Sequence, residues 1–359
     1  MLSAAIAACG SSTPPITPVT DSGQAYVPDT AWRTAVPAAV GFDGARMGAL
    51  VRDVNDGRYG AIDGVVVVRQ GYAVVEYYRN WSRERAHTMQ SVSKSVTSLL
   101  VGLAMQAKPG LTLDTPVVGL FPRYATLEND DTRKHALTMR HLLSMRTSMD
   151  FWEQPYAGSP LDQLNRSSGD WVKYILDRPM VGDPGSTWAY NSGAAILACA
   201  AIREATGEAA DAFAARELFR PLGIRGETWY RSPHDGLPHC GGGLNLRPVD
   251  LARIGYLVLR GGRWGDVRIV SQAWIDESTR PISRGTPVFF SNYGSAYGYF
   301  WWLFPTARGG SDTGVIAASG SGGQWLFVVP SLDLVVAVVA TSGAGLDLLY
   351  DGVLPAITR

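Results

Sequence analysis

Ser91 and Lys94 are the two residues whose types and spacing most directly support chemistry. They stand three positions apart at the start of the run SVSKSVTSLLVGLAMQ, whose apolar residues recur at helical spacing. Positions three apart share one face of a helix, so the hydroxyl lies within reach of the amine. Burial lowers the pKa of a lysine and lets it take a proton from a serine, which becomes a nucleophile. The pair therefore predicts acyl transfer through Ser91, at a helix start whose free N–H groups favour a developing anion.

The same pair also has a structural interpretation, in which Ser91 caps the helix and Lys94 is exposed. The Ser-x-x-Lys pattern occurs once, at one of only four lysines among 32 basic residues. Arginine cannot give up its proton in a protein, whereas a desolvated lysine can. Spacing alone does not decide between the two interpretations.

Tyr190 is the second candidate, in the segment PGSTWAYNSG. The Pro-Gly pair predicts a turn, followed by a short extended piece and then a helix. Tyr190 is expected at that junction, facing a cleft, where a phenol partly ionised beside Lys94 shuttles protons. Its neighbours Asn191 and Ser192 are candidates for hydrogen bonds to the substrate or to Lys94. The alternative is a structural tyrosine with a satisfied hydroxyl.

A glycine-rich segment, SGSGGQ from Ser319, enters a predicted strand. Glycines at the start of a strand let a ligand approach the backbone closely. No helix follows the segment, so it is not a nucleotide-binding loop. The candidate substrate-binding residues here are Ser321, Gly322, Gly323 and Gln324, and the alternative is an ordinary flexible turn.

The elements that must position these residues follow from hydrophobic periodicity. A hairpin is predicted over 62–79 around Gln70-Gly71. Helices are predicted over 91–106, 139–145, 170–176, 193–205, 248–260, 271–278 and 345–354. Strands are predicted over 299–304, 324–329 and 334–341. Both ends are β-rich and the middle is helical, so we expect an α+β fold in which both ends form one antiparallel sheet.

Three parts of the chain are expected. Residues 1–25 form a flexible tether, residues 26–110 and 240–359 form a sheet lobe, and residues 111–239 form a mostly helical lobe. The cleft between the two lobes is the expected active site.

Charge and hydropathy exclude several classes of partner. The 32 Lys and Arg residues balance 32 Asp and Glu residues, so nothing draws the protein to nucleic acid or to an anionic membrane surface. No apolar run reaches the roughly 18 residues of a membrane span. A small neutral substrate is expected.

The three cysteines bear on location. Ile6-Ala7-Ala8-Cys9 resembles a bacterial lipobox, which predicts a lipid anchor at Cys9 and a place in the periplasm or cell envelope. The segment before Cys9 lacks a basic region and is short, so a cytoplasmic location is the alternative. Cys199 is expected to pack in the core, Cys240 is expected in a loop, and the sequence leaves open whether they pair.

Taken together, the motifs resemble the class C β-lactamase, penicillin-binding protein and esterase superfamily. Within it the chain is most similar to the branch of 6-aminohexanoate-dimer hydrolase and related esterases and amidases. The resembling segments are HTMQSVSKSVTSLLVGLA, HLLSMRTSMD, PGSTWAYNSG, GGGLNLRPVDLARIGYLVLRGG, YGYFWW and GSGGQWLFVVPSLDLVV. They cover about residue 62 to the end of the chain, in family order.

The resemblance implies roles for the candidate residues and a β-lactamase/transpeptidase-like fold. Ser91 would be the nucleophile, Lys94 its base partner and Tyr190 a second acid/base group. The oxyanion hole would be the backbone N–H groups of Ser91 and Gln324, and no cofactor or metal is implied. The fold would be an antiparallel sheet with helices on both sides and a helical lobe.

Two departures from the family pattern bear on the substrate. The chain has Ser192 where the Tyr-x-Asn motif has Asn, and Ser321 where the third motif begins with Lys or His. The Lys often helps to hold a substrate carboxylate. We therefore expect an esterase or amidase that acts on a small ester or amide, such as 6-aminohexanoate oligomers. The alternatives are a β-lactamase or D-Ala-D-Ala peptidase, and a penicillin-recognising sensor without turnover.

Two further hypotheses concern other side chains. Metal-dependent hydrolysis would use His234, His239 and Cys240, although the chain has only five His residues and no His-Glu-x-x-His motif. An apolar acyl pocket would be lined by tryptophans, with core packing as the alternative for each of them. These are Trp152, Trp171, Trp188, Trp301 and Trp302.

Overall fold

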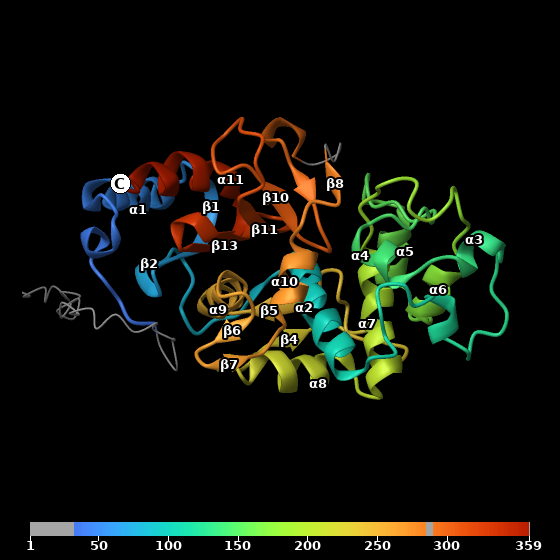
Figure 1. Ribbon diagram of the computed structural model, residues 1–359. Helices are drawn as coiled ribbons and strands as arrows, with labels where there is room; N and C mark the ends of the chain where they lie inside the picture. Colours follow the sequence, from blue (N-terminus) through green and yellow to red (C-terminus); the bar gives the residue numbers. More distant parts are fainter. Residues whose placement is uncertain (1–31, 285–289, 359) are drawn as a thin grey trace, which may run out of the picture.

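The computed structural model describes residues 32–284 and 290–358 of the chain, and its largest element is an eight-stranded antiparallel sheet (Figure 1). The strand order is β2-β1-β13-β12-β11-β10-β9-β8, so the two ends of the chain meet where β1 pairs with β13. The strands are β1 Gly60–Arg69, β2 Tyr72–Tyr78, β8 Ser283–Arg284, β9 Ala296–Tyr297, β10 Trp302–Phe304, β11 Val315–Gly320, β12 Gln324–Val329 and β13 Leu334–Gly343.

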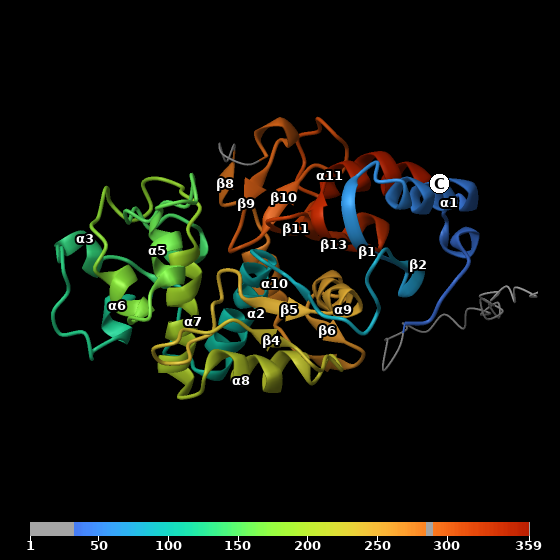
Figure 2. The same ribbon diagram turned by 180° about the vertical axis from the view of Figure 1, so that it is seen from behind.

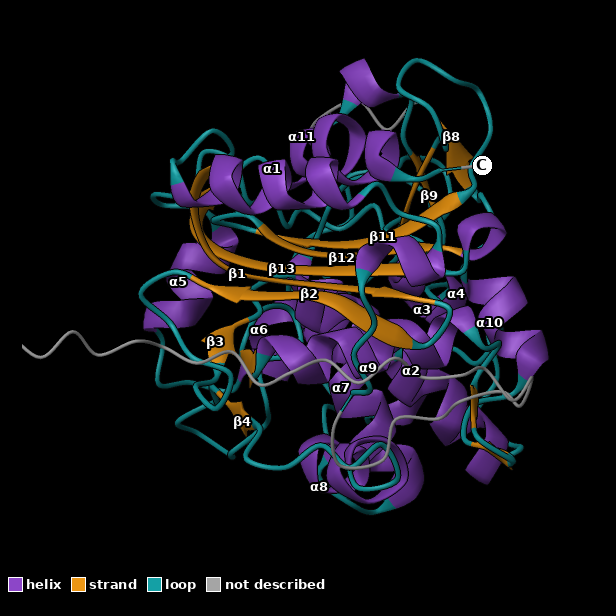
Figure 3. Ribbon diagram, turned by 90° about the vertical axis from the view of Figure 1, so that its left-hand side faces the viewer, coloured by secondary structure: helices purple, strands orange, loops and turns teal. Residues whose placement is uncertain are grey.

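Helices cover both faces of this sheet, as Figure 3 shows. The central strands are therefore nearly continuous apolar runs, VVVV in β1 and LVVAVVA in β13, rather than alternating patterns. One face carries α1 (Gly44–Asn55) and α11 (Gly345–Asp347), and the other carries α2 (Val92–Ala107) and α9 (Pro248–Leu259). At Gly255 of α9 a Cβ would lie 2.6 Å from side chains of β12 and β13, so glycine permits this close packing.

The second part of the molecule is mostly helical and lies beside the sheet. It contains α3 Thr132–His135, α4 Met139–Leu143, α5 Pro160–Arg166, α6 Trp171–Leu176, α7 Ser192–Thr206 and α8 Ala210–Ala214. Seen from behind, α2 lies between this part and the sheet (Figure 2), and α2 packs against α7. The remaining elements are β3 His87–Thr88, β4 Thr228–Trp229, β5 Leu244–Leu246, β6 Arg263–Trp264, β7 Val267–Arg268 and α10 Gln272–Ser278.

The predicted α+β fold with one antiparallel sheet is confirmed. The hairpin of β1 and β2 turns at Gln70 and Gly71, both with positive φ. The strand predicted over 299–304 begins only at Trp302, because the backbone N–H groups of Tyr299 and Phe300 donate to Ser278 and Leu143 instead of to a neighbouring strand. No helix in the described part of the chain is long and apolar enough to cross a membrane.

Candidate active site

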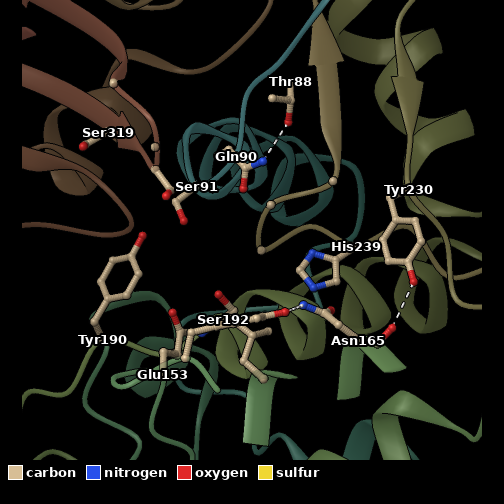
Figure 4. Close-up of a pocket in the computed structure, with 18 of the residues that line it drawn as sticks. Thr88, Gln90, Ser91, Glu153, Asn165, Tyr190, Ser192, Tyr230, His239 and Ser319 are labelled. Atoms are coloured by element: carbon tan, nitrogen blue, oxygen red, sulfur yellow. Dashed lines mark hydrogen bonds between the residues drawn. The ribbon is translucent and has the colours of Figure 1, made fainter. Parts of the chain in front are cut away.

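A pocket of about 910 Å³ opens where the start of α2, the start of α7 and the end of β11 meet. Ser91, the N-cap of α2, lines this pocket (Figure 4). The preceding residue, Gln90, has a φ of 47°, which turns the chain sharply from the short strand β3 into the helix. The site therefore presents a hydroxyl at the positive end of a 16-residue helix.

Lys94 is enclosed one turn along the same helix, with 1% of its surface exposed. Its Nζ lies 3.0 Å from Ser91 Oγ, 2.8 Å from Ser192 Oγ and 2.6 Å from the carbonyl oxygen of Gly241. Burial lowers the Lys94 pKa to about 8, and the charge of Glu153 partly opposes this.

These contacts suit both protonation states of Lys94. The Gly241 carbonyl can only accept, so one N–H is always directed to it. The hydroxyls of Ser91 and Ser192 can accept from an ammonium, and either can donate to a neutral amine. The geometry therefore permits Lys94 to take the proton of Ser91 without a rearrangement.

Tyr190 stands two residues before the start of α7, and its hydroxyl points toward Ser91 (Figure 4). Its ring centroid lies 4.7 Å from Lys94 Nζ. Burial and the charge of Glu153 raise the pKa of Tyr190 well above its ordinary value, and a hydrogen bond with Ser91 opposes this only in part. The direction of this shift contradicts the expected partial ionisation of Tyr190, since desolvation favours the neutral phenol, which can donate a proton.

The glycine-rich segment is only partly in the pocket. Ser321 and Gly323 line it together with Ser319 and Gly320, which the sequence did not single out as binding residues. A Cβ at Gly320 would lie 2.5 Å from the Met89 carbonyl oxygen, so only glycine lets β11 approach the segment before Ser91.

Three predicted binding residues do not line the pocket, although Ser192 does. The Gln324 side chain bonds instead to the backbone of Ala340, with its Nε2 donating at 2.5 Å and its Oε1 accepting at 3.1 Å. Asn191 caps α7 by accepting the Ala194 N–H. Gly322 stands in the turn between β11 and β12. The side chains of Gln324 and Asn191 are therefore used in contacts within the fold.

Two further residues line the pocket, although they belong to no sequence motif that would have identified them as part of an acyl-transfer site. The Glu153 carboxylate accepts a hydrogen bond from the Ser192 N–H, and Glu153 comes from the loop before α5. His239 is buried beside Trp171, and its Nε2 has no partner among the described residues. Burial and the Lys94 charge lower the pKa of His239 to about 4, so its ring is neutral.

Of the five tryptophans predicted as pocket candidates, Trp302 alone lines the pocket. Trp171 and Trp301 are core residues, Trp188 packs edge-on against Tyr297, and Trp152 is 43% exposed. The aromatic wall is formed by Trp302 with three other rings, those of Tyr190, Phe290 and Trp325.

Cys199 and Cys240 form a disulfide, with their Cα atoms 6.0 Å apart. The metal hypothesis is thereby contradicted, because Cys240 has no free thiolate and the exposed His234 ring faces Asp170 at 4.0 Å. The described residues contain no group of three or more His, Cys, Asp or Glu side chains suited to a metal ion. Cys9 lies outside the described residues.

Comparison with known proteins places this geometry in a family. The model of the beta-lactamase family matches residues 38–352. The chain is 25% identical to 6-aminohexanoate-dimer hydrolase of Paenarthrobacter ureafaciens over 289 residues, which are 76% of this chain and 71% of that protein. It is 30% identical to esterase EstB of Burkholderia gladioli, over 47% of each protein, so the alignment spans about half the length of that relative.

Solved structures with the same fold include a putative 6-aminohexanoate-dimer hydrolase from Bacillus anthracis, with a TM-score of 0.71 and 20% identity. It covers 87% of this chain, and 82% of that chain is covered in return. A family VIII carboxylesterase has a TM-score of 0.66 at 16% identity, covering 85% of this chain and 95% of its own. With the family model spanning most of the chain and the Ser91–Lys94–Tyr190 geometry in place, the protein belongs to the beta-lactamase family of serine hydrolases, as its motifs predict.

Proposed function

We propose that the protein hydrolyses small esters or amides through an acyl-enzyme on Ser91. The observation that carries the proposal is the buried amine of Lys94, 3.0 Å from the Ser91 hydroxyl. The Tyr190 hydroxyl points toward the same serine (Figure 4). Lys94 accepts the Ser91 proton while Oγ attacks the carbonyl carbon. Tyr190 donates its proton to the leaving group, and the Lys94 ammonium replaces that proton. Water then releases the acyl group by the same steps in reverse order.

The oxyanion is held by two backbone N–H groups in this scheme. The first is that of Ser91, at the start of α2. The expected second donor is the backbone N–H of Gln324, but Gln324 does not line the pocket. Ser321 does line the pocket, next to the close contact between Gly320 and Met89. We therefore assign the second donor to the Ser321 backbone.

The pocket lining supports an uncharged substrate with an apolar part. Aromatic rings of Tyr190, Phe290, Trp302 and Trp325 form one wall. Among the described residues that line the pocket there is no Lys or Arg, and Glu153 brings a negative charge. A substrate carboxylate, as in β-lactams and D-Ala-D-Ala peptides, would lack a partner there. The names of the relatives, an esterase and a 6-aminohexanoate-dimer hydrolase, support ester or amide substrates.

A substrate panel tests this proposal. Purified protein and its Ser91→Ala variant would be assayed with p-nitrophenyl esters, nitrocefin and short linear amides. We expect Ser91-dependent turnover of esters or amides and little turnover of nitrocefin. Equal rates for the two proteins would refute the nucleophile, efficient nitrocefin hydrolysis would make the protein a β-lactamase, and a stable adduct without product release would make it a sensor.

We also propose that the protein works in an oxidising compartment, the periplasm or cell envelope of a bacterium. The Cys199–Cys240 disulfide supports this, since such bonds persist mainly outside the cytoplasm. The lipobox-like Cys9 would add a lipid anchor. Cell fractionation with an antibody to the protein would test the location, and recovery in the cytosolic fraction would refute it.

A further inference from the structure

Glu153 is the one acidic side chain among the described residues that line the pocket. It stands in the loop between α4 and α5, between Tyr190 and Ser192 in the close-up (Figure 4). It is only partly exposed, and its carboxylate accepts the backbone N–H of Ser192, the first residue of α7. The proposed hydrolysis leaves this carboxylate without a role.

One residue links Glu153 to the base. The Ser192 backbone N–H donates to the Glu153 carboxylate, and the Ser192 hydroxyl accepts from Lys94 Nζ at 2.8 Å. Ser192, at the start of α7, is therefore the residue that lies between the carboxylate and the amine and contacts both. Tyr190 stands two positions before Ser192, so the same contact also fixes the backbone that carries the phenol.

The other groups that face the Lys94 amine carry no negative charge. Ser91 and Ser192 offer hydroxyls, and Gly241 offers a carbonyl. Tyr190 presents the face of its ring at 4.7 Å, and its raised pKa keeps it neutral. His239 lies close enough to feel the Lys94 charge and is held neutral by its lowered pKa. Among the described groups, Glu153 is the anion whose charge acts on Lys94.

We propose that Glu153 is a positioning residue of the proposed hydrolysis, whose carboxylate fixes the start of α7 and stabilises the ammonium that forms when Lys94 takes the Ser91 proton. In that step the Ser91 O–H bond breaks, an N–H bond forms on Lys94, and Ser91 Oγ bonds to the carbonyl carbon. The C=O π bond breaks at the same time, and its electron pair moves to the oxygen to give the oxyanion. Glu153 neither gains nor loses a proton. Its charge lowers the energy of the state in which Lys94 is positive, as a buried carboxylate does for the cation formed in other hydrolases. The inference rests on the proposed function.

The pH dependence of the reaction separates this electrostatic role from simple support of the fold. Glu153→Gln keeps the shape and the acceptor for the Ser192 N–H but removes the charge. Glu153→Asp keeps the charge and shortens the side chain. Glu84→Gln is the matched control, because Glu84 is exposed and does not line the pocket. Each protein would be profiled for kcat/KM on a p-nitrophenyl ester and for the rate of inactivation by a fluorophosphonate.

Without the Glu153 charge Lys94 loses its proton more easily and becomes a weaker base. For Glu153→Gln we therefore expect the acid limb of both profiles to move down by about one pH unit. The high-pH plateau should fall about tenfold, the equivalent of one pKa unit. The limbs of Glu153→Asp and Glu84→Gln should coincide with that of the unchanged protein.

A Glu153→Gln limb that stays in place, or moves upward, would overturn the inference, whatever happens to the plateau. If Glu153→Gln does not fold, the pH profile of Glu153→Asp decides the question. Glu153→Asp keeps the charge, so a displaced acid limb in that variant contradicts the electrostatic role of Glu153. The proposed function is judged separately by Ser91→Ala. An inactive Ser91→Ala with an unmoved Glu153→Gln limb refutes the role of Glu153 alone, whereas an active Ser91→Ala refutes the function itself.

Discussion

The side-chain nitrogen of Lys94 lies 2.6 Å from the carbonyl oxygen of Gly241, a residue 147 positions later in the chain. Gly241 also approaches the start of α7 so closely that a Cβ on it would lie 2.8 Å from Ser192 Cβ. The loop around Gly241 thus joins α2 to α7 and fixes the amine in place. Because the carbonyl accepts one N–H, the remaining hydrogen-bonding positions of the amine face the hydroxyls of Ser91 and Ser192.

Replacing Lys94 by Arg should remove almost all activity. The charge remains, but a guanidinium does not give up its proton near neutral pH and cannot accept one from Ser91. We expect kcat/KM for a p-nitrophenyl ester to fall by about three orders of magnitude or more, close to the loss from Ser91→Ala. The exposed Lys108→Arg is the control and should leave the rate unchanged. A Lys94→Arg enzyme with a tenth of the original rate would contradict the assignment of the base.

Hydrolysis should rise with pH through the pKa of Lys94, which is about 8. Lys94 must be neutral to take the Ser91 proton, so the active fraction grows as pH passes from below this pKa to above it. The profile of kcat/KM between pH 5 and 10 measures this directly. An acid limb near pH 4, typical of a carboxylate base, would speak against Lys94.

Tyr190→Phe should damage poor leaving groups more than good ones. Its phenol is neutral because burial and Glu153 raise its pKa, so it serves mainly to protonate the departing oxygen or nitrogen. A p-nitrophenolate leaves without being protonated, whereas the alcohol of an alkyl ester or the amine of an amide leaves only when it receives a proton. The measurement is the ratio of kcat for a p-nitrophenyl ester to kcat for an alkyl ester or amide of the same acyl group. An unchanged ratio would show that Tyr190 is not the proton donor.

The Cys199–Cys240 disulfide should be detectable and stabilising. Peptide mapping without reductant should recover the two cysteines as one linked pair. Cys199→Ala/Cys240→Ala should lower the free energy of unfolding by about 2–5 kcal/mol, measured by urea titration. It should also lower activity, because Cys240 directly precedes the Gly241 carbonyl that holds Lys94. Cys9 can contribute one free thiol, so more than one free thiol per chain, titrated after denaturation without reductant, would contradict the bond.

The sequence predicted the residues that carry strong local signals. Ser91 and Lys94 lie on one helix, so their distance follows from helical geometry. Tyr190 stands before a helix start that a Pro-Gly turn indicates in the sequence. The predicted hairpin was visible as two β-rich runs around a Gln-Gly pair.

The rest depends on contacts between distant segments, which no local pattern records. Gly241 contacts Lys94 and Glu153 contacts Ser192 only through tertiary packing, and both Gly241 and Glu153 stand in loops without periodicity. The pairing of the Gln324 side-chain amide with the backbone of Ala340 in β13 is likewise a contact between separate strands. The ionisation of Tyr190 was mispredicted because the sequence shows the nearby Lys94 but shows neither the burial nor the carboxylate.

Covalent labelling of Ser91 tests the central claim most directly. The protein would be treated with a fluorophosphonate at pH 8, measured by intact mass spectrometry and then mapped by peptide sequencing. The account predicts one adduct per chain, located on Ser91 and absent from Ser91→Ala and from protein inactivated by Lys94→Arg. An adduct on any other residue, or labelling of Ser91→Ala at the original rate, would contradict it.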